Sequence, residues 1–156
     1  MAESDVFRAN AAAVIINSRG QVLALERDDI PGAWQFPQGG VDKGEDPLDT
    51  ISREICEEIG ISVDKDLTLL AEYPVWLAYE YPQEVYQKYG KRGQAQKWFL
   101  FQIKDDNMEL NLSDVKTVEF SSWKWTDIDE VVEQMVYFKK PVYQMVASWV
   151  KSLLNQ

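Results

Sequence analysis

The sequence predicts an α/β fold in which a mixed β-sheet lies between helices. Three observations support this expectation. Apolar runs of strand length precede a well-capped helix, further strand-like runs follow it, and apolar residues recur at helical spacing near the C-terminus. Strands and helices that alternate in this way pack with helices on both faces of a sheet. We therefore expect an α/β/α sandwich.

The N-terminal quarter predicts a hairpin followed by a loop. Residues Ala11 to Asn17 and Val22 to Glu26 are apolar runs, and the four residues between them have the composition of a turn. The stretch from Arg27 to Gly40 holds two prolines and three glycines. This composition is typical of irregular backbone, so we expect a loop there.

The next segment has a helix start and a helix stop. Asp46 is a suitable cap, Pro47 suits the first helical position, and Gly60 is a typical terminator. Between them, apolar residues three and four positions apart form one stripe that faces the core. These residues are Leu48, Ile51, Ile55 and Ile59.

The C-terminal half predicts further strands and two helices. Strand-like runs cover residues 67–73, 75–81, 97–103 and 123–125, and a polar, partly basic connection spans residues 82–96. A helix is expected near residues 127–135, and Pro141 opens another. One face of the last helix carries Val142, Met145, Val146, Trp149, Val150, Leu153 and Leu154.

Length and composition indicate one domain over residues 1–156, since 46% of the residues are hydrophobic. The N-terminal residues lack the pattern of a targeting segment, and no apolar run reaches the roughly eighteen residues of a membrane span. We expect a cytoplasmic protein with no membrane partner. The sequence leaves the oligomeric state undecided and is compatible with a monomer.

Histidine is absent and Cys56 is the only cysteine, which excludes histidine-based nucleophile systems and makes zinc sites a poor expectation. Cys56 is expected to be a small buried residue. With 26 acidic and 16 basic residues the formal charge is −10. We therefore expect no DNA partner, because an acidic chain repels long phosphate backbones.

Glu54, Glu57 and Glu58 lie on one face of the predicted helix, at positions i, i+3 and i+4. A solvated helix face, with Arg53 paired to Glu57, is the ordinary explanation of such a cluster taken alone. The alternative is a hard divalent cation that offsets the repulsion between the carboxylates. Oxygen ligands favour Mg²⁺, Mn²⁺ or Ca²⁺, and Mg²⁺ fits best because it bridges carboxylates to phosphates.

Residues 39–61, GGVDKGEDPLDTISREICEEIGI, resemble the Nudix box at each of its defining positions. The resemblance implies a Nudix-type sandwich and an Mg²⁺-dependent hydrolase that cleaves pyrophosphate linkages, with Mn²⁺ able to substitute. It implies that Glu57 and Glu58 are the main metal ligands, while Glu54 adds to the metal site or assists the base. Arg53 would orient the carboxylates, and Glu45 would brace the loop through Arg53 or metal-bound water. The general base stays open.

Similarity outside the box extends over nearly the whole chain and includes FRAN at residues 7–10, WQFPQGG at 34–40 and GQAQKWF at 93–99. These segments resemble bacterial RNA pyrophosphohydrolases and the related diadenosine tetraphosphate hydrolases, although Ala9 stands where proline is common. The implied substrates are a 5′-triphosphorylated RNA end, whose hydrolysis initiates RNA decay, or a dinucleoside polyphosphate.

The same resemblance assigns site residues outside the helix. Gly39 and Glu119 would complete the metal site. Tyr79 and Phe138 would lie near a base, although Phe138 is equally compatible with the core. The remaining substrate contacts would come from Arg8, Arg27, Gln38, Lys97 and Lys139.

Three alternatives remain at this stage. One is a hydrolase of free nucleoside triphosphates, and another is a Nudix binding module without activity, against which the complete box argues. The third concerns the basic residues Lys88, Lys91, Arg92 and Lys97, which form either a solvated face or a path for phosphates.

Overall fold

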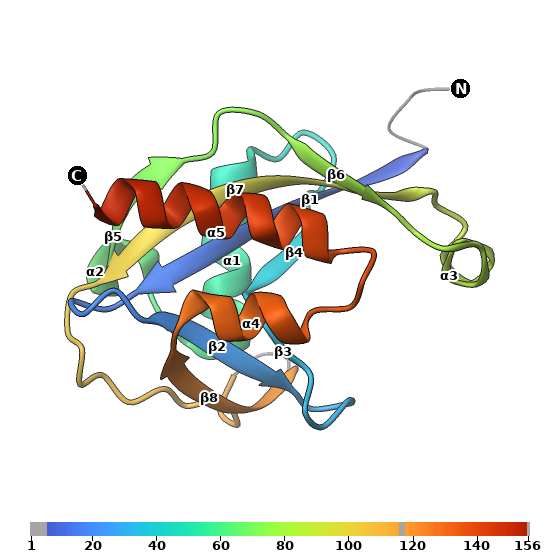
Figure 1. Cartoon of the computed structure of the whole chain (residues 1–156). Coiled ribbons are helices and arrows are strands. Elements are labelled where there is room, and N and C mark those ends of the chain that lie inside the picture. Colours follow the sequence, from blue (N-terminus) through green and yellow to red (C-terminus); the bar gives the residue numbers. More distant parts are fainter. Residues whose placement is uncertain (1–5, 116–117, 156) are drawn as a thin grey trace.

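The computed structural model describes residues 6–115 and 118–155, and the N-terminal residues 1–5, part of the segment taken to lack a targeting pattern, lie outside it. Within the described residues the strands form one eight-stranded mixed sheet (Figure 1). The expected α/β architecture is confirmed. The strands are β1 (Phe7–Ile16), β2 (Val22–Arg27), β3 (Trp34–Gln35), β4 (Gln38–Gly40), β5 (Leu67–Glu72), β6 (Leu77–Glu80), β7 (Gly93–Ile103) and β8 (Phe120–Thr126).

The centre of the sheet is the parallel pair of β1 and β7, which runs from Phe7 opposite Gly93 to Ile16 opposite Gln102. The other ladders are antiparallel: β2 and β4 pair with β1, β5 and β6 with β7, and β3 and β8 with β2. The long central pair therefore fixes the positions of β4 and β6, the two short strands that border the site described below.

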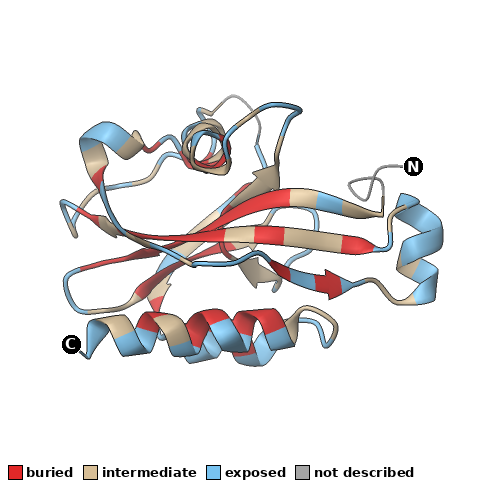
Figure 2. Ribbon diagram, turned by 90° about the horizontal axis from the view of Figure 1, so that it is seen from above, coloured by how far each residue is buried: buried red, intermediate tan, exposed pale blue. Residues whose placement is uncertain are grey.

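Helices cover both faces of this sheet (Figure 2). They are α1 (Pro47–Ile59), α2 (Val63–Asp66), α3 (Gln83–Tyr89), α4 (Ile128–Gln134) and α5 (Lys140–Leu154). Side chains alternate along the central strands, so Val14 packs toward α4 and α5 while Ile15 packs toward α1. Two apolar cores result, one on each face. No helix in the described part of the chain is long and apolar enough to cross a membrane.

Helix α1 forms as its sequence predicts. The Asp46 carboxylate accepts a hydrogen bond from the Leu48 backbone N–H at 2.9 Å, and Gly60 ends the helix in a left-handed conformation with φ 71°. Ile51, Ile55 and Ile59 are buried against the sheet. Cys56, expected to be buried, is exposed, because it lies off this apolar stripe.

Residues 27–40 and 82–96 contain more regular structure than their composition predicts. The first stretch includes β3 and β4, and the second includes α3 and the first residues of β7. Pairing with β1 and β2 supplies hydrogen-bond partners for the backbone groups of β4 and β3, respectively. Such tertiary pairing overrides local propensity.

Helix α5 begins at Lys140, one residue before Pro141. Met145 and Leu154, predicted on its apolar face, are 48% and 41% exposed. The face that packs on the sheet is therefore narrower than the apolar pattern indicated.

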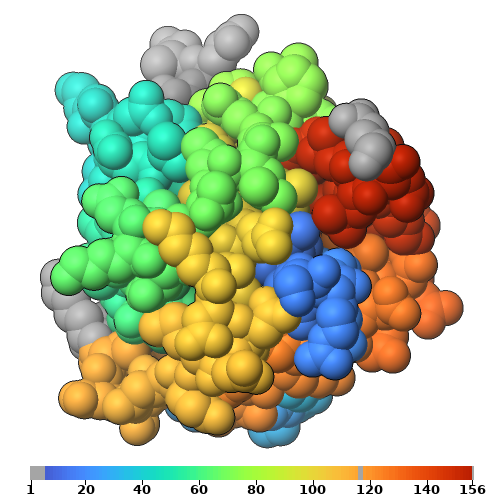
Figure 3. Space-filling model, turned by 90° about the vertical axis from the view of Figure 1, so that its left-hand side faces the viewer, coloured from blue at the N-terminus to red at the C-terminus, as the bar shows by residue number. Residues whose placement is uncertain are grey.

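One end of the sandwich is closed by segments distant in sequence (Figure 3). In the turn between β1 and β2 the Asn17 side chain accepts hydrogen bonds from the backbone N–H groups of Arg19 and Gln21. The Ser18 N–H donates to Asp106 at 3.0 Å. The opposite end, where α3 lies, carries the larger of the cavities described below (Figure 1).

Replacing Ile55 with alanine should lower the free energy of unfolding by about 2–5 kcal/mol, because it opens a cavity between α1 and the sheet. Urea denaturation measures this change. Cys56→Ala on the same helix is the control and should change stability by no more than about 0.5 kcal/mol. Equal effects of the two substitutions would contradict the packing described here.

Candidate functional site

The glutamate face of α1 lies beside β4, opposite the apolar stripe of the same helix. Glu54 and Glu57 are half-buried there, and Glu58 is 3% exposed. The cluster is therefore not the solvated helix face that its sequence alone would favour. Desolvated carboxylates are costly unless an opposite charge, a hydrogen bond or a proton compensates them.

Arg53 provides much of that compensation. Its Nε and Nη2 donate to Glu45 at 3.1 and 3.0 Å, and its Nη1 donates to Glu54 at 2.8 Å and lies 3.6 Å from Glu57. Its Nη2 also lies 3.4 Å from the Gly40 carbonyl oxygen. The predicted bracing by Glu45 and the predicted contact of Arg53 with the carboxylates are both present.

Glu45 is held by several hydrogen bonds. Besides Arg53, the Thr50 hydroxyl donates to it at 2.7 Å, and the Asp42 backbone N–H donates at 3.1 Å. The Arg53 guanidinium and these donors lower the pKa of Glu45 to about 2. The loop between β4 and α1 is thereby tied to the helix by an ionised carboxylate.

Two consecutive glycines make room for side chains of the site. A Cβ atom at Gly39 would lie 2.2 Å from Cδ of Glu54, and one at Gly40 would lie 2.8 Å from Nη2 of Arg8. Both separations are far inside van der Waals contact. In the structure these two glycines admit the side chains of Glu54 and Arg8.

Glu54 and Glu58 face a small polar cavity of about 260 Å³, which we call the acidic cavity. Its other lining residues are Arg8, Asn10, Gln38, Gly39, Gly40, Gln94, Glu119 and Lys139. Glu119 comes from the segment before β8, where its carbonyl oxygen accepts a hydrogen bond from the Asp28 N–H at 2.8 Å. Carboxylates distant in sequence thus meet at one place. Glu57 and Arg53 are not among the residues that line it.

Glu58 is the most constrained of these carboxylates. Its Oε2 is buried and has no hydrogen-bond partner in the part of the chain that the structure describes. Burial, hydrogen bonding with Glu54 and the charge of Glu119 raise the pKa of Glu58 to about 11. An unpartnered buried oxygen among carboxylates fits a divalent cation, which would supply the missing positive charge.

The carboxylates are not yet arranged around an ion. No group of three or more acidic or cysteine side chains among residues 6–115 and 118–155 converges on one point where a metal could bind. Arg53 holds Glu54 at 2.8 Å, so this carboxylate is already engaged.

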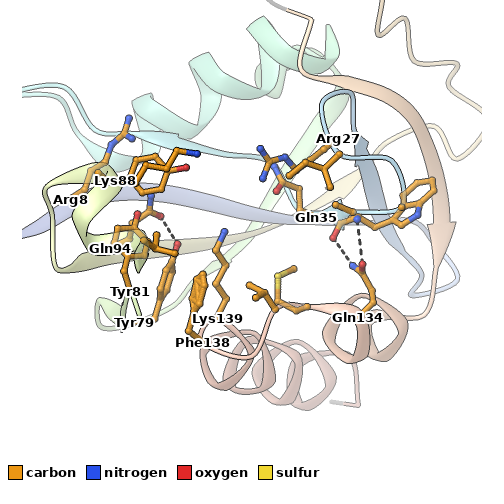
Figure 4. A pocket seen from close by; sticks show the side chains of 18 of the residues that line it. Arg8, Arg27, Gln35, Tyr79, Tyr81, Lys88, Gln94, Gln134, Phe138 and Lys139 are labelled. Carbon is orange, nitrogen blue, oxygen red and sulfur yellow. Dashed lines mark hydrogen bonds between the residues drawn. The ribbon is translucent and has the colours of Figure 1, made fainter. Parts of the chain in front are cut away.

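A larger cavity of about 750 Å³, here the basic cavity, adjoins the acidic one (Figure 4). The two share Arg8, Gln94 and Lys139 in their linings. Its charged lining residues are Arg8, Arg27, Lys88, Lys91 and Lys139, and no aspartate or glutamate of the described residues lines it. In a chain of net charge −10, this separation of charge favours an anionic ligand.

Arg27 and Lys139 reach the basic cavity from opposite sides. The Asp29 carboxylate accepts two hydrogen bonds from Arg27, at 2.9 and 2.7 Å, which fixes the guanidinium in place. Burial and the charge of Arg27 lower the pKa of the Lys139 amine. Figure 4 shows Arg27, Lys88 and Lys139 with their nitrogens directed toward the same space.

Aromatic side chains complete the basic cavity. Tyr79 is only 6% exposed, and its hydroxyl donates to Gln94 at 2.8 Å, so most of this ring belongs to the core. Phe138 is half-buried, with its ring centroid 6.0 Å from that of Tyr79 and 6.2 Å from that of Tyr81. Phe138 is therefore placed where a base could contact it.

Lys97 is the predicted substrate residue that the structure does not bring to either cavity. Its amine donates to the Tyr73 carbonyl oxygen at 2.7 Å and lies 3.4 Å from Glu72. Neighbouring residues of a strand face opposite sides of the sheet, and Gln96 takes the side of the acidic cavity, where it donates to Gln38 at 2.9 Å.

Several lining residues escaped the sequence assignment. Gln35 and Tyr81 line the basic cavity from β3 and from the end of β6, and Gln94 borders both cavities. The signal for Gln94 was its position in the GQAQKWF segment. Lys88 and Lys91 were among the basic residues predicted to form either a solvated face or a path for phosphates, and both line the basic cavity.

The fold and the site define a class of protein. Residues 6–146 match the family model described as "NUDIX domain", and the chain therefore belongs to the Nudix hydrolase family. Nudix hydrolases generally use divalent metal ions, in agreement with the carboxylate chemistry of the acidic cavity.

Similar proteins agree with this assignment. The chain is 43% identical to Nudix hydrolase 26, chloroplastic, of Arabidopsis thaliana, over 96% of this chain and 71% of that one. It is 42% identical to the RNA pyrophosphohydrolase of Rhodospirillum rubrum, over 91% of this chain and 86% of that one. In fold it resembles the Escherichia coli dihydroneopterin triphosphate pyrophosphohydrolase, with a TM-score of 0.71 and 22% identity over 90% of this chain and 96% of that one. It also resembles a Caenorhabditis elegans Ap4A hydrolase, with a TM-score of 0.68 and 22% identity over 93% of this chain and 98% of that one.

Replacing Glu45 with glutamine should lower the melting temperature at pH 7, because it removes the charge that Arg53 holds. The pKa of Glu45 is about 2 in the folded chain against 4.5 ordinarily, so its contribution is complete above about pH 4.5 and is lost as the pH falls toward 2.

Thermal unfolding of the variant and the parent across this range measures the effect. We expect the difference between them to shrink as the pH falls, and Glu109→Gln, at an exposed position, should show no such trend. A difference independent of pH would mean that the ion pair with Arg53 is not its source.

Proposed function

We propose that this protein is an Mg²⁺-dependent pyrophosphohydrolase that removes pyrophosphate from the 5′-triphosphorylated end of RNA. The observation that carries this proposal is the joining of two cavities of opposite character. Carboxylates suited to a divalent cation line one cavity, five cationic side chains line the other, and Arg8 and Lys139 lie between them. A polyphosphate that spans this junction would contact both.

Glu54, Glu57, Glu58 and Glu119 would hold the cation, with the Gly39 carbonyl as a further oxygen ligand. Oxygen donors of this kind suit Mg²⁺, and Mn²⁺ would substitute. When bound, such an ion lowers the pKa of water and offsets charge on phosphate oxygens. Its recruitment would also compensate the buried Glu58 oxygen, which has no hydrogen-bond partner among residues 6–115 and 118–155.

The protein's own residues perform the remaining tasks. Arg8 and Lys139 would bind phosphate oxygens at the junction, and Arg27, fixed by Asp29, would bind the next part of the substrate. With no histidine in the chain, a glutamate must accept the proton from the attacking water, directly or through a second water. Glu54 and Glu57 are the candidates, and Arg53 holds both in place.

RNA is the favoured substrate for two reasons. Relatives at 42% and 39% identity, from Rhodospirillum rubrum and Helicobacter pylori, are named RNA pyrophosphohydrolases. The basic cavity also extends well beyond the junction with the acidic cavity, as a ligand with nucleotides behind its triphosphate would require. Cytoplasmic location stays a prediction from the sequence.

A dinucleoside polyphosphate is the second candidate substrate. It presents the same phosphates followed by a nucleoside, and the fold resembles that of the C. elegans Ap4A hydrolase. Turnover of 5′-triphosphorylated RNA, diadenosine tetraphosphate and free nucleoside triphosphates, compared with Mg²⁺ under identical conditions, separates the candidates. A preference for either of the latter two over RNA would overturn the proposal.

Glu57→Gln tests whether the protein is an enzyme or a binding module. We expect turnover of triphosphorylated RNA to fall by about 10²–10⁴-fold, because the substitution removes a charge needed for metal binding or proton transfer. Glu109→Gln should retain parental turnover. Parental activity in the Glu57 variant, or none in the parent, would count against the assignment.

Glu58→Gln tests the metal site without measuring turnover. The neutral amide has nearly the same shape as the carboxylate, so the metal-free melting temperature should not fall. Mg²⁺ at 100 times its dissociation constant should stabilise the parent by about 2.7 kcal/mol, and this stabilisation should be lost in the variant. Equal Mg²⁺-induced shifts in both proteins would place the cation elsewhere.

A further inference from the structure

Helix α3 forms one wall of the basic cavity and is not used by the proposed chemistry. It connects β6 to β7 at the end of the sandwich, and its residues Val85, Lys88 and Tyr89 line the cavity (Figures 1 and 4). We propose that this face of α3 binds a nucleotide of the RNA downstream of the first one, with its base on the Tyr89 ring and its phosphate on Lys88. The inference rests on the proposed function and extends it.

The aromatic rings of the cavity lead toward α3. The ring centroids of Phe138 and Tyr81 lie 6.2 Å apart, and those of Tyr81 and Tyr89 lie 5.7 Å apart. Along this path the rings become more accessible, from half-buried Phe138 and Tyr81 to Tyr89, which is 58% exposed. An accessible ring within a ligand cavity is suited to stacking on a base of any identity.

Positive charge accompanies these rings. The Lys88 Nζ lies 5.4 Å from the Tyr89 ring centroid, and Figure 4 shows this amine directed toward the centre of the cavity. Lys91, just beyond the helix, also lines the cavity, whereas Glu84 on the same helix does not. An aromatic ring beside a lysine matches the two parts of a nucleotide, the base and the phosphate.

The position of α3 selects the downstream part of the ligand. Arg8, Gln94 and Lys139 mark the junction with the acidic cavity, where the triphosphate must lie for hydrolysis. None of the α3 residues lines the acidic cavity. A group that contacts Tyr89 is therefore separated from the reacting phosphates, as later nucleotides of an RNA chain would be.

Tyr89→Ala tests this inference, with Tyr86→Ala as the matched control. Tyr86 lies on the same helix and is 47% exposed, but it does not line the cavity. We expect the KM for a 5′-triphosphorylated octanucleotide to rise on the order of 10-fold in the Tyr89 variant, with kcat retained. The inhibition constant of a nucleoside triphosphate competitor should rise much less. Tyr86→Ala should match the parent, and Tyr89→Phe should restore the parental KM.

Lys88→Gln gives a second measurement that stays decisive if Tyr89→Ala lowers stability. Loss of one phosphate contact should reduce the slope of log KM against log salt concentration by about 0.7. A parental slope in this variant, or equal changes for RNA and for the nucleoside triphosphate in the Tyr89 variant, would overturn the inference and leave the proposed function intact. If the parent does not hydrolyse triphosphorylated RNA, both the inference and the proposed function are wrong.

Discussion

The site depends on the way Arg53 holds carboxylates that would otherwise repel one another. One guanidinium binds Glu45 and Glu54, lies near Glu57 and approaches the Gly40 carbonyl, so it links the loop before α1 to the helix itself. An arginine stays protonated at every relevant pH, so Arg53 attracts these carboxylates throughout. Its donors lie in one plane, so they also fix the orientation of the carboxylates. Arg53 makes no such contact with Glu58, whose buried Oε2 has no hydrogen-bond partner among the described residues.

The separation of charge into two adjoining cavities follows from this arrangement. Carboxylates gathered on α1 include a buried Glu58 oxygen that a cation would compensate, while the cationic side chains that would meet a polyphosphate come from other segments. Arg8 belongs to both cavities and lies in the space that Gly40 leaves open. An acidic protein can therefore present a local surface of opposite sign, which net charge alone does not reveal.

The fold was predictable where local and tertiary preferences agree. Helix α1 has a side-chain cap, a proline at its start, an apolar stripe and a terminal glycine, and it forms as expected. The short strands β3 and β4 were not predictable, because proline and glycine dominate their surroundings and only pairing with β2 and β1 makes them regular. Cys56 was misplaced because residue type was given more weight than its position relative to the apolar stripe.

The same distinction applies to the site. Half of the residues that line the acidic cavity, Glu54 and Glu58 among them, lie within residues 38–58, so much of its chemistry could be inferred from a single stretch of sequence. The basic cavity takes its walls from the start of β1, the loop between β2 and β3, α3, and the segment between α4 and α5. No single stretch of sequence reveals such a surface. Lys97 is an example: its segment predicted a substrate contact, but its side chain faces Glu72. In this chain, reaction chemistry is encoded locally, whereas substrate recognition is a property of the assembled fold.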